Sequence, residues 1–245
     1  MAELDAVTFD YWETLCTDPE GDFIGRRVAA MAAALAAHGV DAPLEELEAG
    51  HLAAWDDWNQ KWEDNTDHVD WRWAAALTLA SVPHLAPHPS DAYDDAFQAF
   101  HDSTVEPNLV LLDGVPEVLT ALHDRGVRIG IICDVGLIPS TTLRRELERL
   151  GVFHLFDHWS FSDEVGVYKP DTRIFEHALA GLGGVDPGRA AHVGDRRRTD
   201  VAGAQRMGMR AVRIADAYDD PSFGPTGDAV ISSHFELLAA LGLSG

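Results

Sequence analysis

The second half of the chain alternates between short apolar segments and helix-forming segments, and this alternation constrains the fold more than any other feature. We predict strands at residues 128–133, 158–161, 190–193, 210–214 and 229–232, and helices at 115–125, 139–150, 172–182, 199–207 and 235–241. Strands that alternate with helices of about ten residues form a parallel sheet covered on both faces. The prediction is therefore a three-layer, Rossmann-like α/β core.

The first strand of this sheet is separated from the others by a long helical block. Residues 5–10 are predicted to form a short buried strand, whereas the chain from about residue 17 to 110 shows helical patterns at 24–38, 44–62, 71–82 and 90–100. Such a block reads as an insertion between the first strand and the rest of the sheet. We therefore expect a core domain of residues 1–16 and 111–245, and an α-helical domain of residues 17–110.

Composition limits the partners of the chain. Its 245 residues include 18 Lys+Arg against 41 Asp+Glu, a net charge of −23, which repels nucleic acid and anionic membranes. No apolar stretch reaches the roughly 18 residues of a membrane span, and the N-terminus lacks the features of a secretory signal. Two cysteines, Cys16 and Cys133, make no disulfide framework. We expect a cytoplasmic protein that binds neither nucleic acid nor membrane.

Polar residues stand at or near the expected ends of the strands: Asp10, Cys133, Asp134, Lys169, Asp195 and Asp200. In open α/β sheets, ligands bind at the carboxyl ends of the strands, so these side chains are expected to lie together. A single Asp at the beginning of a helix is often only a cap, and the prediction depends on the set. Lys169 is one of only two lysines in the chain, and it directly precedes Pro170.

Four motifs resemble those of the haloacid dehalogenase-like hydrolase superfamily, and the likeness covers nearly the whole chain. They are Phe-Asp-Tyr-Trp-Glu-Thr-Leu at residues 9–15, the stretch ending at Cys133, Gly166 to Phe175 with its Tyr-Lys-Pro-Asp, and Val193 to Asp200 with its Gly-Asp. The resemblance implies that the helical block is a cap inserted after the first motif. It also implies a hydrolase acting through an aspartyl intermediate.

The resemblance implies a metal site and a nucleophile. Asp10 would be the nucleophile, and Asp10, the backbone carbonyl of Trp12, Asp195 and Asp200 would hold Mg²⁺. Hard oxygen ligands suit Mg²⁺, and the cation lets an anionic carboxylate approach an anionic phosphoryl group. Lys169 would act in catalysis by neutralising the charge of the intermediate and holding Asp10 in position.

The substrate-binding residues implied by the resemblance are less regular. Cys133 takes the place of a Ser or Thr that donates to the substrate, although a thiol is a weaker donor and a buried structural cysteine is an equal alternative. Asp134 would add negative charge near an anionic substrate, unless the metal or an Arg offsets it. Arg196 opens the run Arg196 to Arg198, which attracts an anion or forms salt bridges to neighbouring carboxylates.

Trp12 departs most from the resemblance, because phosphatases of the superfamily carry there an Asp that acts as general acid. Losing such a group typically costs on the order of 10² to 10⁴ in rate, and Glu13 is one possible replacement. Three hypotheses remain. The leading one is a Mg²⁺-dependent phosphatase of a small organic phosphate. The others are a 2-haloacid dehalogenase-like hydrolase, whose halide leaves without protonation, and a binding or regulatory protein with little turnover.

The helical block contains an aromatic stripe, with Trp55, Trp58 and Trp62 on one face of the predicted helix at 44–62. Such a stripe usually belongs to a core. The alternative is an aromatic surface that contacts a substrate. The partner we expect is a small anionic molecule, with an apolar or aromatic part under this second interpretation.

Overall fold

A computed structural model describes residues 4–19, 23–82, 85, 90–103 and 109–243. The chain divides into two compact units. The first comprises the described parts of Met1–Pro19, Leu109–Asp134 and Arg144–Gly245, and the second those of Glu20–Asn108 and Val135–Leu143. We call them the sheet unit and the helical unit and describe each by itself.

The sheet unit is built on a parallel sheet, as predicted. Its order is β5 (His158–Phe161), β4 (Arg128–Cys133), β1 (Ala6–Phe9), β6 (Ala190–Gly194), β7 (Arg210–Ile214) and β8 (Ala229–Ile231). Each neighbouring pair runs parallel. The central strand β1 is buried along its whole length, which fits its Ala-Val-Thr-Phe sequence. Asp10, the next residue, therefore lies at the carboxyl edge in the middle of the sheet.

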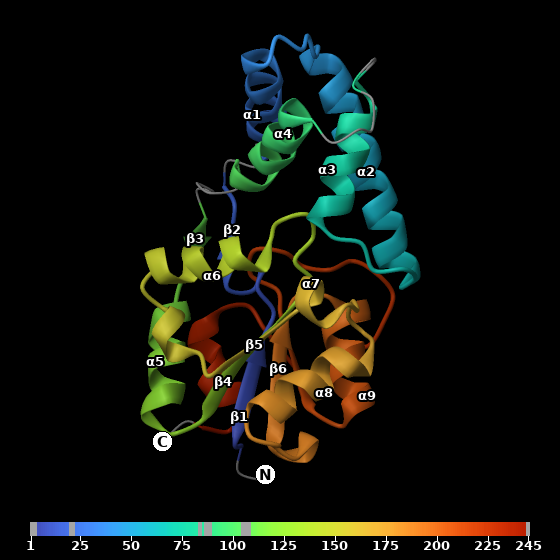
Figure 1. Cartoon of the computed structure of the whole chain (residues 1–245). Coiled ribbons are helices and arrows are strands. Elements are labelled where there is room, and N and C mark those ends of the chain that lie inside the picture. Colours follow the sequence, from blue (N-terminus) through green and yellow to red (C-terminus); the bar gives the residue numbers. More distant parts are fainter. Residues whose placement is uncertain (1–3, 20–22, 83–84, 86–89, 104–108, 244–245) are drawn as a thin grey trace. The chain divides into compact units, whose positions relative to one another are not determined.

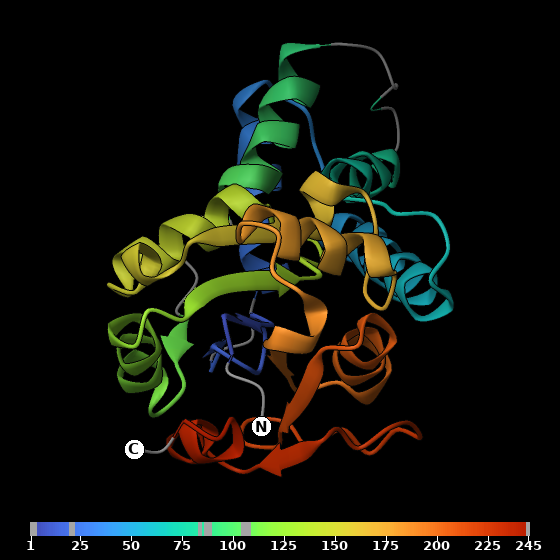
Figure 2. The ribbon, with the colours of Figure 1, turned by 90° about the horizontal axis from the view of Figure 1, so that it is seen from below.

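Helices cover both faces of this sheet (Figures 1 and 2). Helices α8 (Thr172–Gly181) and α9 (Ala202–Met207) contact each other and pack on one face. Helices α5 (Val115–Asp124) and α10 (Leu237–Ala240) pack on the other face. The 3₁₀ helix η4 (His234–Glu236), which directly precedes α10, contacts both of them. The predicted three-layer core is confirmed.

The helical unit contains α1 (Phe23–Ala37), α2 (Leu44–Asp64), α3 (Trp71–Ala80) and α4 (Asp91–Asp102). Helix α1 packs against α2 and α4, and α2 packs against α3. The segment Val135–Leu143, which includes a loop after β4 and the first residues of α6 (Ser140–Arg149), also belongs to this unit. The buried guanidinium of Arg27 on α1 donates a hydrogen bond to the carbonyl of Leu137 in that loop.

Several short elements were not predicted. Strands β2 (Cys16–Thr17) and β3 (Val110–Leu111) form an antiparallel pair on either side of the helical insertion in the sequence. Helix α7 (Ser162–Val165) and the 3₁₀ helices η1 (Phe153–Leu155) and η2 (Pro187–Arg189) are each a single turn. A π-helix, η3 (Arg197–Val201), precedes α9 where a single helix was expected. These elements are too short to produce a periodic pattern.

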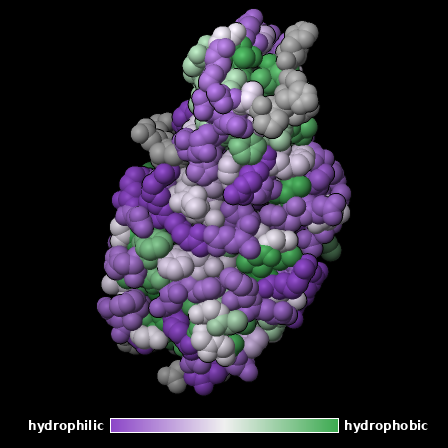
Figure 3. Space-filling model, in the orientation of Figure 1, coloured by the Kyte–Doolittle hydropathy of each residue, from purple (hydrophilic) through white to green (hydrophobic). Residues whose placement is uncertain are grey.

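The surface is dominated by hydrophilic residues on the face shown in Figure 3, in keeping with the acidic composition. Among the residues that the structure describes, no helix combines the length and the apolar character that crossing a bilayer requires.

Candidate functional site

Three buried carboxylates meet at the carboxyl edge of the sheet. Asp10 follows β1, Asp195 follows β6, and Asp200 lies in η3. One carboxylate oxygen from each lies within 4.8 Å of the others. The adjacent strands set this geometry, because the Asp10 N–H donates to the Val193 carbonyl of β6 at 2.8 Å. The exposed fractions of the three side chains are only 6%, 1% and 1%, so water does not screen their charges.

Lys169 is the buried cation of this cluster. Its Nζ lies 2.6 Å from Asp10 Oδ1, 2.6 Å from Asp200 Oδ1 and 3.0 Å from the Ile132 carbonyl oxygen of β4. An ammonium group has three N–H donors, and these three acceptors use all of them. Lys169 therefore fixes the orientation of both carboxylates and holds them beside β4.

Burial and charge shift the ionisation of all four groups. Burial raises the pKa of Asp10 to about 6, although Lys169 opposes this rise. Burial, followed by the charges of Asp200 and Asp10, raises the pKa of Asp195 well above its usual value. Burial alone would raise the pKa of Asp200, but the contacts with Lys169 and His192 have the larger combined effect and lower it. Opposite charges, led by Asp10, raise the pKa of Lys169 in spite of its burial.

His192 joins this network through a contact that sequence reasoning missed. Its Nε2 lies 3.2 Å from Asp200 Oδ1, and its Nδ1 lies 2.9 Å from the hydroxyl of Thr8 on β1. From sequence, a histidine within a buried strand is indistinguishable from a packed core residue. The only available signal was its position, two residues before the end of the strand that leads to Asp195.

Cys133 is the last residue of β4, and Asp134 follows it. Cys133 is fully buried, and burial, followed by the charge of Asp10, raises its pKa well above the usual thiol value. Asp134 Oδ1 accepts a hydrogen bond from the backbone N–H of Lys169 at 3.0 Å. Asp134 thus positions the loop that carries Lys169, while the predicted substrate contacts of both residues remain predictions.

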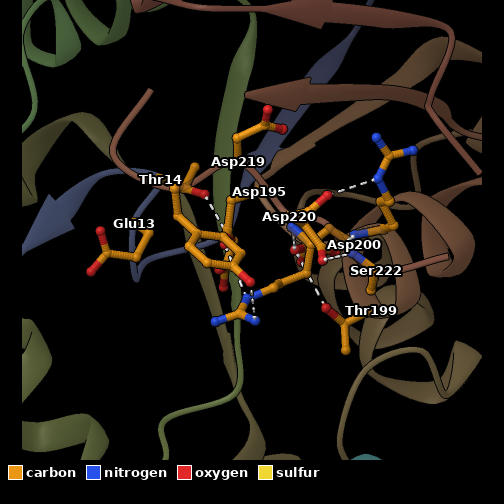
Figure 4. A network of polar contacts seen from close by, with 12 residues as sticks. Glu13, Thr14, Asp195, Thr199, Asp200, Asp219, Asp220 and Ser222 are labelled. Carbon is orange, nitrogen blue, oxygen red and sulfur yellow. Dashed lines mark hydrogen bonds and ion pairs between the residues drawn. The ribbon is translucent and has the colours of Figure 1, made fainter. Parts of the chain in front are cut away.

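The loop after β1 shapes the other side of the cluster. Thr14 Oγ1 lies 3.5 Å from Asp195 Oδ1, and Trp12 forms a backbone bridge with Cys16. Glu13 has a φ of 54°, in the left-handed region that costs an L-residue free energy. Its carboxylate accepts from Thr17 Oγ1 at 3.1 and 3.2 Å and points away from Asp195 in Figure 4. Glu13 is therefore not oriented to replace the general acid.

Arg196 contacts two carboxylates of the cluster. Its Nε is 3.1 Å from Asp195 Oδ2, and its backbone N–H donates to Asp200 Oδ2 at 2.9 Å. The guanidinium lies over the ring of Tyr218, 4.2 Å from the centroid, with a longer contact of 3.4 Å to the Tyr218 hydroxyl. The structure thus places Arg196 in a salt bridge with a carboxylate of the cluster, which was one of the two alternatives expected for this residue.

The cluster fits a divalent cation. Asp195 Oδ2 is buried and has the ion pair to Arg196 but no hydrogen bond in the described structure. Among the described residues, Asp10, Asp195 and Asp200 form the only group of three or more candidate ligands. Three carboxylates face one buried ammonium and one half-exposed guanidinium, so negative charge remains in excess. Hard carboxylate oxygens are the donors that Mg²⁺ prefers.

Known proteins resemble this chain in sequence and in fold. The glyceraldehyde 3-phosphate phosphatase of Methanopyrus kandleri is 38% identical over 119 residues, 49% of each chain, so the match spans about half the length of that relative. Two solved structures share the fold, each with a TM-score of 0.67, 24% identity and 98% coverage of both chains: a phosphatase from Thermococcus onnurineus and a 2-haloacid dehalogenase from Pseudomonas syringae pv. Tomato DC3000.

The match to a family pattern covers more of the chain than the match to the sequence relative does. The pattern of the haloacid dehalogenase-like hydrolases matches residues 4–208, which include β1, the buried carboxylates and Lys169. The matched range covers most of the chain and contains all four residues of the buried cluster. The chain belongs to the haloacid dehalogenase-like hydrolase family.

Proposed function

We propose that the chain is a Mg²⁺-dependent phosphatase of a small organic phosphate. The proposal depends on the cluster of Asp10, Asp195 and Asp200, because a bound cation would compensate the excess of buried negative charge. The three carboxylates and the backbone carbonyl of Trp12 would hold Mg²⁺. When bound, the cation would polarise a phosphoryl oxygen and offset the charge of the nucleophile.

Asp10 is the proposed nucleophile. Its carboxylate oxygen forms a bond to phosphorus while the bond from phosphorus to the leaving alcohol breaks, and water then hydrolyses the aspartyl phosphate. Lys169 keeps Asp10 ionised and aligned through the 2.6 Å contact to Oδ1. Because all three donors of Lys169 are already used, it acts on the reaction through its charge rather than through a new hydrogen bond.

Trp12 determines which phosphates are good substrates under this proposal. It offers no acid–base group, and Glu13 is bound to Thr17. The leaving oxygen therefore departs with little assistance, which favours leaving groups of low pKa. The test is a series of aryl and alkyl phosphates, for which the rate should fall steeply as the pKa of the leaving alcohol rises. The Trp12→Asp variant should flatten this dependence and gain about 10² on alkyl phosphates. A flat dependence in the wild type would contradict the role given to Trp12.

The second candidate is a metal-independent displacement of halide from a 2-haloacid. The lack of a general acid at Trp12 favours it, because halide leaves without protonation. The pairing of Asp195 with Asp200 favours the phosphatase instead, because halide displacement needs no metal. The two neighbouring folds do not discriminate, since both have the same TM-score.

One experiment separates these candidates and a third, a binding protein with little turnover. Phosphate release from a panel of phosphomonoesters and halide release from 2-chloropropionate are measured with Mg²⁺ and with EDTA. Mg²⁺-dependent phosphate release supports the phosphatase, and metal-independent halide release supports the dehalogenase. Absence of both, with tight ligand binding, supports the binding protein. Asp10→Asn should abolish either activity, and retained turnover would refute Asp10 as the nucleophile.

The tryptophans of α2 bear on the substrate class. Trp58 and Trp62 stack with ring centroids 5.8 Å apart, and Trp55 lies 5.2 Å from Trp58. Trp58 is buried, but Trp55 is 43% exposed, so the stripe is only partly core. A substrate with an apolar or aromatic part remains our proposal, and the panel should include phosphates that differ only in that part.

A further inference from the structure

Arg196 and Arg197 are adjacent and carry the same charge, but their side chains contact different groups. The Nε of Arg197 donates to the backbone carbonyl of Asp220 at 3.0 Å, and its N–H donates to the Asp220 carboxylate at 2.7 Å. Arg197 therefore fixes the loop after β7. The guanidinium of Arg196 instead forms an ion pair with the buried carboxylate of Asp195.

The oxygen that Arg196 contacts is unusual. Asp195 is 1% exposed, and among the described residues its buried Oδ2 accepts no hydrogen bond and has only the ion pair to Arg196 Nε at 3.1 Å. The other oxygen, Oδ1, has the long 3.5 Å contact from Thr14. The carboxylate of Asp195 therefore has few hydrogen bonds for a buried anion, and Arg196 forms an ion pair with it.

Arg196 is held at this position by contacts that do not depend on Asp195. Its guanidinium stacks on the Tyr218 ring at 4.2 Å, and its backbone N–H is bound to Asp200 Oδ2. Its side chain remains 39% exposed, so it can leave the carboxylate and stay on the ring without burying an unpaired charge. The guanidinium therefore has a second contact, the Tyr218 ring, that does not require Asp195.

We infer that Arg196 is the counter-ion of Asp195 in the metal-free site and that a divalent cation competes with it for this carboxylate. This inference rests on the proposed metal site. A cation at Asp195 and a guanidinium 3.1 Å from Oδ2 repel each other, so metal binding displaces the guanidinium from the oxygen. The displaced group, still on Tyr218, becomes the cation available to an anionic substrate. Arg196 therefore weakens metal binding and couples it to anion binding.

The test is the dissociation constant of Mg²⁺, measured by isothermal titration calorimetry on metal-free protein without substrate. Arg196→Gln should bind Mg²⁺ on the order of tenfold more tightly than the wild type, because it removes a positive charge next to a ligand. Arg197→Gln is the matched control, because it removes the same charge from the neighbouring residue, which does not contact Asp195. Its Mg²⁺ affinity should stay within about twofold of the wild type.

The outcomes separate this inference from the proposed function. If wild type and both variants bind Mg²⁺ with the same affinity, the metal site stands and the competition is refuted. If Arg197→Gln tightens binding as much as Arg196→Gln, the effect is long-range charge and the competition is also refuted. If no protein binds Mg²⁺, the metal site itself fails and the inference fails with it. Melting curves in EDTA show whether each variant is folded.

Discussion

Replacing Lys169 by Met tests the electrostatic account of the site directly. The substitution removes the ammonium that lies 2.6 Å from both Asp10 Oδ1 and Asp200 Oδ1, and it leaves two buried carboxylates without their partner. Breaking a buried ion pair from one side typically costs about 3–5 kcal/mol. At about 2–4 °C per kcal/mol for a chain of this size, the melting temperature should fall by roughly 6–20 °C.

The size of this loss should depend on pH, with a definite sign. In the wild type, burial already raises the pKa of Asp10 to about 6. Without Lys169 the pKa rises further, so the folded variant binds a proton that the unfolded chain has released. Stability therefore decreases as pH increases through this range. Urea unfolding should show the largest loss at pH 8 and a smaller one at pH 5, and Mg²⁺ should restore part of the loss.

Lys61 is the other lysine of the chain and provides the control. Its Nζ lies 2.6 Å from Asp57 Oδ2, the same distance as in the buried pairs, but both partners are partly exposed. Lys61→Met should therefore cost less than about 1 kcal/mol. The reasoning is wrong if the Lys169 variant at pH 8, in EDTA, is no less stable than the Lys61 variant.

Three further predictions concern other buried or strained residues. Burial lowers the pKa of His234 from its usual 6.5 to about 4; between pH 8 and pH 5 the wild type should lose about 2 kcal/mol more unfolding free energy than His234→Leu, measured in urea. Because Glu13 has a φ of 54°, Glu13→Gly should be more stable than Glu13→Ala by about 1 kcal/mol, and the reverse order would contradict the left-handed backbone. Burial raises the pKa of Cys16 to about 12 and that of Cys133 well above its usual value, so neither thiol should react with a disulfide reagent at pH 8 until urea unfolds the chain.

The sheet was predictable because its signals are local. Apolar segments, turn residues and helical periods repeat along the chain, and each is read within about 15 residues. The meeting of Asp10, Lys169, Asp195 and Asp200 followed from one topological rule, that parallel strands share their carboxyl edge. The structure places Lys169 against two of these three carboxylates. Their roles in catalysis remain proposals.

The contacts that could not be predicted join distant segments through single side chains. Tyr218 and Asp220 lie in an irregular stretch after β7, yet they contact Arg196 and Arg197. Arg27 lies on α1 and reaches a loop more than a hundred residues later, so that Val135–Leu143 joins the helical unit. Neither contact produces a periodic pattern in the sequence, because a single residue from each of the two segments is enough to form it.

The π-helix η3 makes the position of the Asp200 side chain depend on the number of residues between Asp195 and Asp200. The N–H groups of Asp200 and Val201 both donate to the Arg196 carbonyl, at 3.1 Å each, so the turn is one residue wider than an α-helical turn. Deleting one residue from this turn would rotate the following side chain by about 100° about the helix axis. The carboxylate of Asp200 would then swing away from Lys169 and His192, even if every neighbouring residue kept its identity. Within this segment, a change in the number of residues therefore disrupts the site even when every residue type is kept.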